Sequence, residues 1–409
     1  MEYVTAGESH GPYLSAIISG FPANVQLDQQ RLLADLRQRQ IGYGRGGRMQ
    51  IETDQVQIIS GVRFGKTLGS PIGLLLPNRD FENWHAVMSV WPTTTQNSAT
   101  VTKRIITRPR PGHADLVGGL KYDQLRDLRN VLERASARET AMRVAIGSLC
   151  QQFLAQFGIV IAGVVTQIGA ASLSQESLRQ ASRPQSRRDF EREVIAPIRQ
   201  QSTRTLDVET NSRMQATIDQ AKSDQTTLGG QIRVIVQGLP LGLGSYVSAN
   251  RKLDARLSSA LMSINAIKGV SFGDGFDFGH ETGRAAVDAI FWQNDSYQRS
   301  ENHQGGLEGG MTNGMPLIID LVMKPIPTQP TGAPTVDIRT HELTRATVER
   351  SDTTAVPAAS VIAEAMTAIT VMQAFCEMFG EDENQRIQQN FARYQRYLKG
   401  QRTEGQERS

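Results

Sequence analysis

Two long helical stretches set into β-rich sequence constrain the fold of this chain more than any other feature. The capping box Ser136–Glu139 begins a predicted helix that runs to about Phe157, and a second, apolar-striped helix is predicted over Ala358–Met378. Because strands and helices do not alternate regularly, we expect an α+β fold rather than a doubly wound sheet. Apolar runs and alternation predict strands over 13–21, 49–76, 158–170, 231–237 and 317–324.

Two further helices are predicted from caps and apolar faces. Asp28 is a good N-cap for a helix over 29–40, and Lys252–Ile264 places its apolar residues on one helical face. The polar segment 173–228 is interpreted as loops and surface helix rather than as a linker between domains. Irregular structure is expected over 78–102 and 270–314.

The composition is that of a soluble globular protein, with 39% hydrophobic and 21% charged residues among 409. A net charge of +3 does not by itself indicate nucleic-acid binding. There is no signal-peptide pattern and no run of about 18 apolar residues, so we expect neither export nor a membrane span. Cys150 and Cys376 lie in apolar, helix-like sequence, which favours free thiols in a reducing, cytoplasmic compartment.

Candidate chemistry gathers in the stretch Arg104–Asp115. Its two prolines fix their own φ angles and favour extended conformations at the residues before them, Arg108 and Arg110. A stiff strip of this kind can hold His113, whose charge changes near neutral pH, among fixed positive charges. Such an arrangement suits a site that binds an anion and moves a proton. The alternative is a basic surface turn with an uninvolved histidine.

A second basic stretch, Gly42–Arg48, has four glycines and two arginines, so its backbone can approach a ligand closely. Its spacing matches the dinucleotide fingerprint, but it follows a basic helix rather than a strand, and no helix starts after it. Gly61–Thr67 resembles a P-loop but is one residue short between its glycines. We therefore reject both motifs.

The arginines of this region are better explained by a small polyanion. Arg39, Arg45 and Arg48 can act as forked donors to carboxylate or phosphate groups. The alternative is an RNA- or polyanion-binding module that uses the arginines of 37–48 and 104–113. Sparse aromatic residues and nearby acids argue against RNA.

The remaining candidate residues suit proton transfer and anion binding rather than covalent catalysis. The histidines have no metal-binding spacing, and no Gly-x-Ser-x-Gly elbow is present for a nucleophilic serine. His10, His113 and Asp352 remain as candidates, together with the arginines. No role is assigned to His85, His280, His303 and His341.

Five stretches, in this order along the chain, resemble the motifs of the chorismate synthase family. The resemblance runs from about residue 1 to about residue 378 and leaves out the polar tail. Ala135 departs from the pattern, since many family members have Ser there, but a backbone contact would survive the change. The five stretches are Gly7–Pro22, Gly42–Arg48, Arg108–Asp115, Glu133–Arg143 and Arg350–Ala359.

The resemblance implies an FMNH2-dependent trans-1,4-elimination of phosphate from 5-enolpyruvylshikimate 3-phosphate. The product is chorismate, in the shikimate pathway of aromatic amino-acid biosynthesis. Phosphate leaves C3 and a hydrogen leaves C6 without net redox change, and the reduced FMN lends an electron transiently. NADPH is a candidate reductant of the flavin, although the sequence shows no dinucleotide fold and outside reduction is favoured.

The resemblance also implies roles for individual residues. His10 would give a proton to the leaving phosphate, His113 would protonate or stabilise the reduced flavin near N1, and Asp352 would work with flavin N5 in removing the C6 proton. The residues implied to hold substrate are Arg39, Arg45, Arg48, Arg110 and Arg350; in some family members the first two also contact nicotinamide nucleotide. The implied FMN contacts are Arg134, Ala135, Ser136, Asn265, Ala266, Gly309, Lys324, Pro325, Ile326, Pro327, Thr328 and Arg350.

Simpler explanations exist for three of these contacts. Capping alone would explain Ser136, a turn alone would explain Gly309, and Lys324 would fit the end of an edge strand. The fold implied by the resemblance is an α+β sandwich with helices layered between antiparallel sheets, assembled as a homotetramer without nucleic-acid or membrane partners. Residues 1–380 would form one catalytic domain, and 381–409 a polar C-terminal helix and tail.

Overall fold

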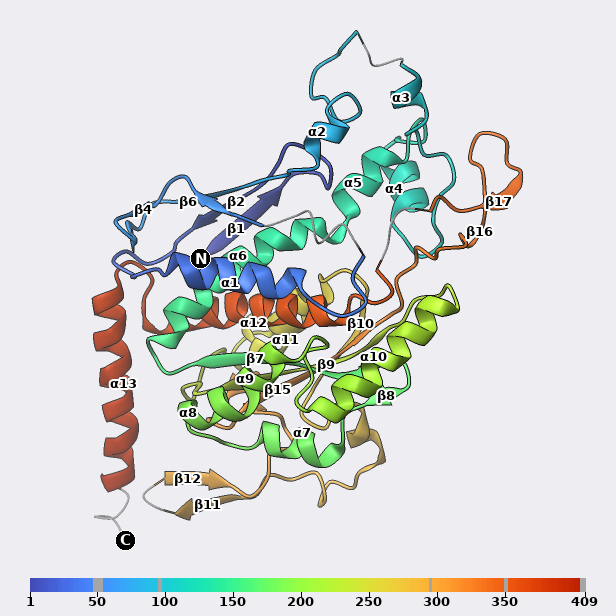
Figure 1. Ribbon diagram of the computed structural model, residues 1–409. Coiled ribbons are helices and arrows are strands. Elements are labelled where there is room, and N and C mark those ends of the chain that lie inside the picture. The colour runs from blue at the N-terminus through green and yellow to red at the C-terminus, as the bar shows by residue number, and fades with distance from the viewer. Residues whose placement is uncertain (47–53, 95–97, 294–295, 349–351, 405–409) are drawn as a thin grey trace.

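The computed structural model describes residues 1–46, 54–94, 98–293, 296–348 and 352–404. In these residues, long helices pack between two antiparallel sheets (Figure 1), which confirms the expected layered α+β sandwich. The first sheet has the order β1-β2-β6-β3, with bounds Glu2–Ala6, Tyr13–Ser19, Ile72–Pro77 and Gln57–Ile58. The second has the order β10-β15-β9-β7-β8, with bounds Ile267–Phe272, Leu317–Met323, Gly230–Gln237, Val160–Ile168 and Ala171–Ser172.

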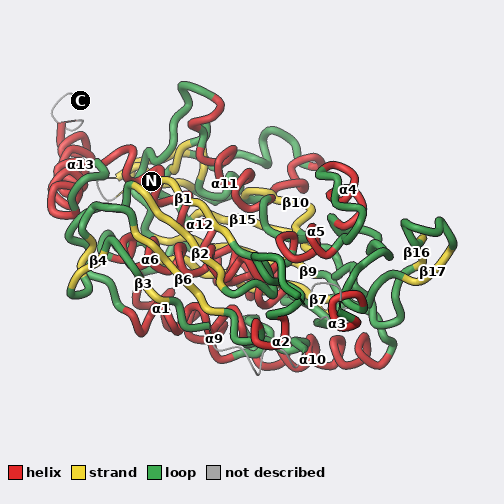
Figure 2. The backbone as a smooth tube through the Cα atoms, turned by 90° about the horizontal axis from the view of Figure 1, so that it is seen from above, coloured by secondary structure: helices red, strands yellow, loops and turns green. Residues whose placement is uncertain are grey.

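The middle layer is built from four helices of the described chain. They are α1 (Gln29–Gln40), α6 (Thr140–Ala155), α11 (Leu253–Met262) and α12 (Val356–Phe379). α12 packs against the other three helices and against β7 and β9, while α6 also contacts β2. Figure 2 shows the first sheet lying across α6 and α12.

Burial patterns explain why each sheet takes its place. In β2, Leu14, Ala16 and Ile18 are buried and alternate with more exposed residues, so one face of this strand meets the helices. β7 is buried along almost its whole length because helices cover its outer face as well. There Phe190, Val194 and the other apolar residues of a second core cluster pack against the sheet. The covering elements are α7 (Gln175–Ser182), α8 (Arg187–Phe190), the π-helical turn Glu191–Ile195 and α9 (Ala196–Gln200).

α12 is the central helix of the core. Pro357 in its first turn needs no hydrogen-bond partner, and the helix ends at Gly380, whose φ of +106° favours glycine. Among the described residues, it is the one helix long and apolar enough to cross a membrane. However, 89% of its most apolar 18-residue window is buried inside the protein, which is typical of the core helix of a soluble protein.

Glycines allow α12 to approach its neighbours closely. A Cβ added at Gly147 of α6 would lie 2.3 Å from the Cβ of Ala365. A Cβ added at Gly163 of β7 would lie 2.5 Å from the carbonyl oxygen of Ser360. Both distances are far below van der Waals contact, so the close packing of α12 against α6 and against β7 requires glycine at both positions.

The remaining elements surround the three layers. Figures 1 and 2 place α13 (Asn384–Glu404) and the hairpin of β16 (Pro334–Val336) and β17 (Leu343–Arg345) at opposite ends of the protein. The other helices are α2 (Phe81–Trp84), α3 (Ala99–Thr102), α4 (Asp115–Lys121), α5 (Arg129–Ala135), α10 (Val208–Ser223), α13 (Asn384–Glu404) and the short turns Ala137–Glu139, Ala249–Arg251 and Gly275–His280. The other strands are β4 (Val62–Arg63), β5 (Lys66–Thr67), β11 (Ile290–Gln293), β12 (Ser296–Arg299), β13 (Leu307–Glu308), β14 (Met311–Thr312), β16 (Pro334–Val336) and β17 (Leu343–Arg345).

Most predicted elements are confirmed, with differences in detail. Asp28 caps α1 through hydrogen bonds from two backbone N–H groups, as expected. Ser136 instead caps a 3₁₀ turn, accepting from Arg138, and Glu139 pairs with Arg143 rather than returning to Ser136. The predicted capping box is therefore wrong, and α6 begins at Thr140.

The stretch 270–314, predicted as irregular, contains part of β10 and the hairpins β11–β12 and β13–β14. Residues 49–53 of the predicted β-region lie outside the described residues.

Candidate active site

A cavity of about 630 Å³ lies where loops from both sheets meet the ends of the middle helices. This volume falls in the range of small-molecule sites. Among the described residues, the walls come from seven stretches: 9–10, 39–46, 110–114, 132–138, 262–268, 323–328 and 352–355. The site is thus assembled from segments that are far apart in the sequence.

The three predicted catalytic side chains, His10, His113 and Asp352, all line this cavity. Of the predicted binding residues, the following also line it: Arg39, Arg45, Arg110, Ala135, Ser136, Asn265, Ala266, Lys324, Ile326, Pro327 and Thr328. Arg134, Gly309 and Pro325 are described but are not part of the lining. Arg48 and Arg350 lie outside the described residues.

His10 is held by a buried carboxylate. Its Nδ1 lies 2.9 Å from both carboxylate oxygens of Glu133, and its backbone N–H donates to Oε2 at 2.8 Å. Glu133 also accepts a hydrogen bond from Arg129 at 3.0 Å. Burial raises the pKa of Glu133, but the hydrogen bonds from His10 and Arg129 outweigh it and hold this pKa below its ordinary value. Because an ionised carboxylate can only accept, Nδ1 of His10 carries a proton.

The imidazole of His10 lies flat against the indole of Trp84, with ring centroids 3.9 Å apart and an interplanar angle of 25°. The indole Nε1–H donates to Asp80 at 3.1 Å. The guanidinium groups of Arg104 and Arg129 lie 4.2 and 4.9 Å from the indole centroid, within cation–π range. Trp84 belongs to the segment predicted as irregular, and sequence reasoning assigned it no role.

The turn that carries His10 is clamped by Asn78, at the end of β6. The Asn78 side-chain amide donates to the carbonyl oxygens of Ser9 and Gly11, at 3.2 and 2.7 Å. Its Oδ1 in turn accepts from Arg138 at 3.1 Å. The backbone around His10 is therefore fixed from the side of the first sheet as well as by Glu133.

His113 is paired with a second buried carboxylate, Asp115, which is fully enclosed. Nδ1 of His113 lies 2.6 Å from Oδ1 of Asp115, while Arg110 donates to Asp115 through Nε at 2.8 Å and Nη2 at 3.0 Å. Burial raises the pKa of Asp115, but the hydrogen bonds from His113 and Arg110 more than offset it and leave this pKa far below its ordinary value. Arg110 also donates to Thr328 at 3.1 Å, and Lys324 donates to the carbonyl of Gly112 at 2.7 Å.

Asp352 and the loop after α1 meet at another wall. Oδ2 of Asp352 forms an ion pair with Nη1 of Arg45 at 3.1 Å, and Oδ1 accepts the backbone N–H of Gly46 at 2.8 Å. The backbone N–H of Thr353 donates to the carbonyl of Gly44 at 2.8 Å. Gly44 has a φ of +87°, a conformation that glycine adopts without strain. Gly44 therefore serves the turn that brings Arg45 to Asp352.

Arg39 and Arg138 form the inner wall, and the buried carboxylate of Asp54 holds both of them from behind. Arg39 donates to Thr140 at 3.1 Å and to the carbonyl of Ala137 at 2.9 Å, and one of its Nη atoms lies 3.7 Å from Asp54. Arg138 donates to Asp54 at 2.7 Å. Arg138 lines the cavity but was not predicted, although it lies in the quoted stretch Glu133–Arg143. Ser9 and Lys268 were missed as well, and no sequence pattern singled out Lys268.

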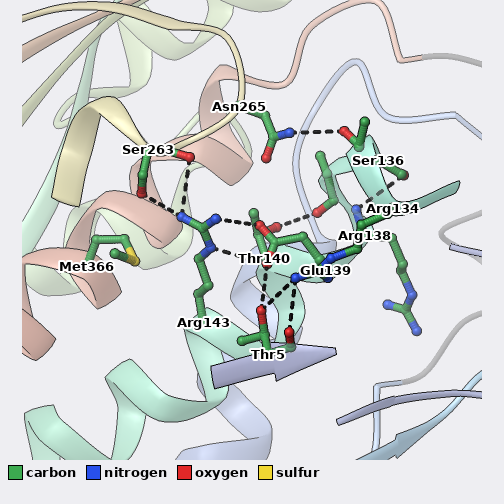
Figure 3. Close-up of polar contacts among 12 residues, drawn as sticks. Thr5, Arg134, Ser136, Arg138, Glu139, Thr140, Arg143, Ser263, Asn265 and Met366 are labelled. Carbon is green, nitrogen blue, oxygen red and sulfur yellow. Dashed lines mark hydrogen bonds and ion pairs between the residues drawn. The ribbon is translucent and has the colours of Figure 1, made fainter. Parts of the chain in front are cut away.

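The wall formed by residues 262–268 has an unpartnered buried acceptor and a strained backbone position. Asn265 donates to the carbonyl of Ala135 at 3.2 Å, but its Oδ1 is buried without a hydrogen-bond partner. Ala266 has a φ of +66°, which is strained for a residue with a Cβ. Arg143 ties this segment to α6 by donating to Ser263 at 2.7 Å (Figure 3). An unpaired buried acceptor costs about 1–3 kcal/mol, so a ligand N–H that reaches it would stabilise the complex.

Arg134 and Gly309, two of the predicted flavin contacts, are explained by other parts of the described structure. Arg134 donates to the carbonyl and the hydroxyl of Thr5, both at 3.0 Å. Gly309 lies in the turn between β13 and β14 with a φ of +59°, as the turn explanation predicted. Both residues thus have a structural role that is independent of the cavity.

The cavity as a whole is suited to an anion and to proton transfer. Asp352 is the one carboxylate among the described residues that line it. The cationic lining residues are Arg39, Arg45, Arg110, Arg138, Lys268 and Lys324. Several fixed positive charges therefore face the cavity together with two imidazoles, each tied to its own carboxylate.

Known proteins with similar sequences share one description. Residues 1–376 match the family described as chorismate synthase. A Bacillus cereus protein, "Chorismate synthase 1", is 49% identical over 401 residues, which are 98% of this chain and 100% of that protein. A Syntrophotalea carbinolica protein, "Chorismate synthase", is 50% identical over 398 residues, 97% of this chain and 98% of that protein. A solved structure, "Crystal Structure of Chorismate Synthase", superposes with a TM-score of 0.77 at 37% identity and covers 98% of both chains.

Proposed function

This chain belongs to the chorismate synthase family, and we propose that the cavity lined by His10, His113 and Asp352 is its active site. The chain is a lyase of the shikimate pathway that forms chorismate from 5-enolpyruvylshikimate 3-phosphate. In this 1,4-elimination, the C6–H electron pair forms a new double bond, the existing double bond shifts, and phosphate leaves with the C3–O pair. The observation that carries the proposal is the convergence of these three side chains on one cationic cavity.

The family implies a reduced flavin, and we propose that it is FMN bound against the 262–268 and 323–328 walls. The residues present fit such a group: the unpartnered Oδ1 of Asn265 can accept from a flavin N–H, and Lys324 supplies a positive charge nearby. When bound, the reduced flavin would lend an electron transiently to the substrate and receive it back. The proposed contacts are Ala135, Ser136, Asn265, Ala266, Lys324, Ile326, Pro327 and Thr328; Arg134, Gly309, Pro325 and Arg350 rest on the family resemblance alone.

The arginines are proposed to hold the substrate, which bears two carboxylates and a phosphate. Arg39, Arg45 and Arg110 line the cavity, and each charge-assisted hydrogen bond is worth roughly 1.5–3 kcal/mol net. Arg48 and Arg350 are proposed for the same role from the resemblance. Arg138 and Lys268 join the set because they face the same cavity.

Three side chains are proposed to handle protons. His10 gives a proton to the departing phosphate, and His113 holds a proton near flavin N1, with Nδ1 anchored on Asp115. Asp352, which also lines the cavity, helps to remove the proton from C6. A positioned acid or base of this kind typically contributes about 10²–10⁴-fold in rate.

Burial of two of its arginines weighs against the alternative function, RNA binding, whereas Arg37, Arg104 and Arg108 of the same stretches are exposed. Arg39 and Arg110 are only 5% and 8% exposed, and each is hydrogen-bonded within the wall of the cavity. Arginines that track a nucleic-acid backbone must instead be accessible along a groove.

Three further properties are proposed. A homotetramer is supported by exposed apolar side chains on the β11–β12 hairpin, including Phe291, Trp292 and Tyr297, which a second copy could cover. A cytoplasmic location is supported by Cys150 and Cys376, both buried free thiols. We also propose that residues 1–380 act as one catalytic domain, with 381–409 as a C-terminal appendage.

An anaerobic assay with purified protein tests the proposed function. Phosphate and chorismate should appear in equal amounts from 5-enolpyruvylshikimate 3-phosphate when chemically reduced FMN is present, and neither should appear with oxidised FMN. Turnover without any flavin would overturn the flavin assignment. Adding NADPH with oxidised FMN tests the reductant. We expect no NADPH oxidation by the pure protein, because its sequence shows no dinucleotide fold.

A further inference from the structure

We propose that Glu133 and Trp84 are positioning residues that hold His10 with its exchangeable proton on Nε2, a role that rests on the proposed function of His10 as the acid for phosphate departure. Neither residue was singled out by a motif. Both are buried, at 1% and 5% exposure, and both contact the imidazole directly. They act on the reaction through His10 and do not touch the substrate themselves.

Glu133 fixes which nitrogen of His10 can exchange a proton. Its two carboxylate oxygens lie equally close to Nδ1, and one of them also receives the backbone N–H of the same residue. Turning the ring over would break the Nδ1 hydrogen bond while leaving a buried carboxylate partly unsatisfied. The Nδ1 proton therefore stays in place, and Nε2 is the nitrogen through which His10 can serve the cavity.

Arg129 adds to the larger effect of His10 in keeping Glu133 charged. It donates to Oε1 of Glu133 at 3.0 Å, and its own side chain is 5% exposed. When His10 is an imidazolium, this buried group contains two cations and one carboxylate, with one positive charge in excess. A phosphate in the cavity would balance that charge, so the charged form of His10 and a bound phosphate group should stabilise each other.

Trp84 fixes the plane of the imidazole. Its indole lies parallel to the ring at stacking distance and is itself held by Asp80 and by the guanidinium group of Arg104. Stacking on one face and hydrogen bonding at one edge leave the ring no rotation that keeps both contacts. A fixed ring matters for the rate, because a misplacement of the acid by about 1 Å can lower the rate 10²-fold.

The proton transfer that this arrangement supports is balanced. The C3–O bond of the substrate breaks and its electron pair leaves on a phosphate oxygen. That oxygen receives the proton from Nε2, and His10 becomes a neutral imidazole that still donates from Nδ1 to Glu133. The charge of the buried carboxylate does not change during the transfer, because Glu133 remains ionised throughout.

Glu133→Gln tests the tautomer, because an amide can also donate to Nδ1 and so permits the other tautomer. We expect kcat to fall about 10²–10⁴-fold with KM for the shikimate ester changed only a few-fold. Glu139→Gln is the matched control: Glu139 is also buried and paired with an arginine, but it lies outside the cavity lining.

A second measurement does not depend on turnover. In proton NMR of the folded wild-type protein, His10 should give a downfield Nδ1–H resonance that disappears in His10→Gln. This resonance should be absent in Glu133→Gln and retained in Glu139→Gln. If it is retained in Glu133→Gln and kcat stays within a few-fold of the wild type, Glu133 has no role in setting the tautomer and the proposal fails.

Trp84 is tested by a pair of substitutions. Trp84→Phe keeps a ring against His10, and kcat should stay within about 5-fold of the wild type, whereas Trp84→Leu should lose at least about 10-fold in kcat at nearly constant KM. Equal losses in both variants would show that stacking is not what matters. A wild-type protein that shows the His10 resonance but no lyase activity would instead refute the proposed function and leave the geometry of His10 intact.

Discussion

Arg45 and Asp352 form an ion pair within the cavity, with Nη1 and Oδ2 3.1 Å apart. The residue proposed to bind substrate and the residue proposed to serve as the base therefore neutralise each other. An anionic substrate group that engages Arg45 would compete with Asp352 for the guanidinium. Substrate binding would in this way release Asp352 from its ion pair at the moment when a base is required.

Asp352→Asn should lower kcat about 10²–10⁴-fold and change KM only a few-fold, because the amide fills the same space but cannot accept a proton. Steady-state kinetics with saturating reduced FMN measure both parameters. Asp219→Asn is the matched control, since Asp219 accepts from Tyr43 of the same loop at 2.8 Å but lies outside the cavity lining. An Asp352→Asn variant with near-normal kcat would remove the base from the proposal.

His113→Ala should lower kcat by about 10²-fold or more while leaving the affinity for 5-enolpyruvylshikimate 3-phosphate largely intact, because the imidazole is proposed to act on the flavin. Single-turnover kinetics and substrate titration separate the two effects. His280→Ala serves as control, since His280 is exposed and does not line the cavity. A large rise in KM with unchanged kcat would show that His113 binds substrate instead.

Asp115→Asn should destabilise the protein at neutral pH by about 3 kcal/mol, because Arg110 and His113 lose a buried charged partner. The pKa of Asp115 is depressed by folding, so its contribution is fully present above the unfolded value of about 3.9 and is lost as pH falls below it. Urea unfolding of both proteins at neutral and acidic pH measures this. A difference that stays constant down to the lowest pH at which the wild type is folded would contradict the assignment.

Asn265→Ala should weaken binding of reduced FMN by roughly 5–30-fold, as expected for the loss of one hydrogen bond of about 1–2 kcal/mol. Thermal stability without flavin should fall little, because the substitution also removes a buried acceptor that has no partner. Anaerobic flavin titration and thermal unfolding give the two quantities. Undiminished flavin affinity would mean that Oδ1 of Asn265 does not receive a flavin N–H.

Gly147→Ala should destabilise the protein by about 1–3 kcal/mol, because the new methyl group would overlap Ala365 and force α6 away from α12. Denaturant unfolding measures the change. Gly279→Ala provides the control, since a Cβ there meets nothing within 4 Å. Equal effects of the two substitutions would show that the helix spacing tolerates a methyl group.

Several elements of the layers could be predicted from local sequence patterns such as apolar runs and helix caps. The apolar run over 13–21 and the N-cap at Asp28 predicted β2 and α1. Local patterns failed where tertiary contacts dominate. Glu139 fits a capping box, but Arg143 and Thr5 compete for its carboxylate, so the box does not form.

The site was predictable in part. His10 and His113 were found by their motifs, but their partners Glu133 and Asp115 lay inside the quoted stretches without any feature that marked them as partners. Trp84 could not be found, because its stacking on His10 joins residues 74 positions apart in the sequence and follows from no periodicity. Contacts of this kind depend on how loops from different layers meet.

The cavity draws its walls from seven stretches between residues 9 and 355. A fragment that lacks any one of these stretches therefore cannot form the complete site, which exists only when the whole of 9–355 has folded. Rate measurements on this protein consequently double as a gauge of the fraction of molecules that are correctly folded.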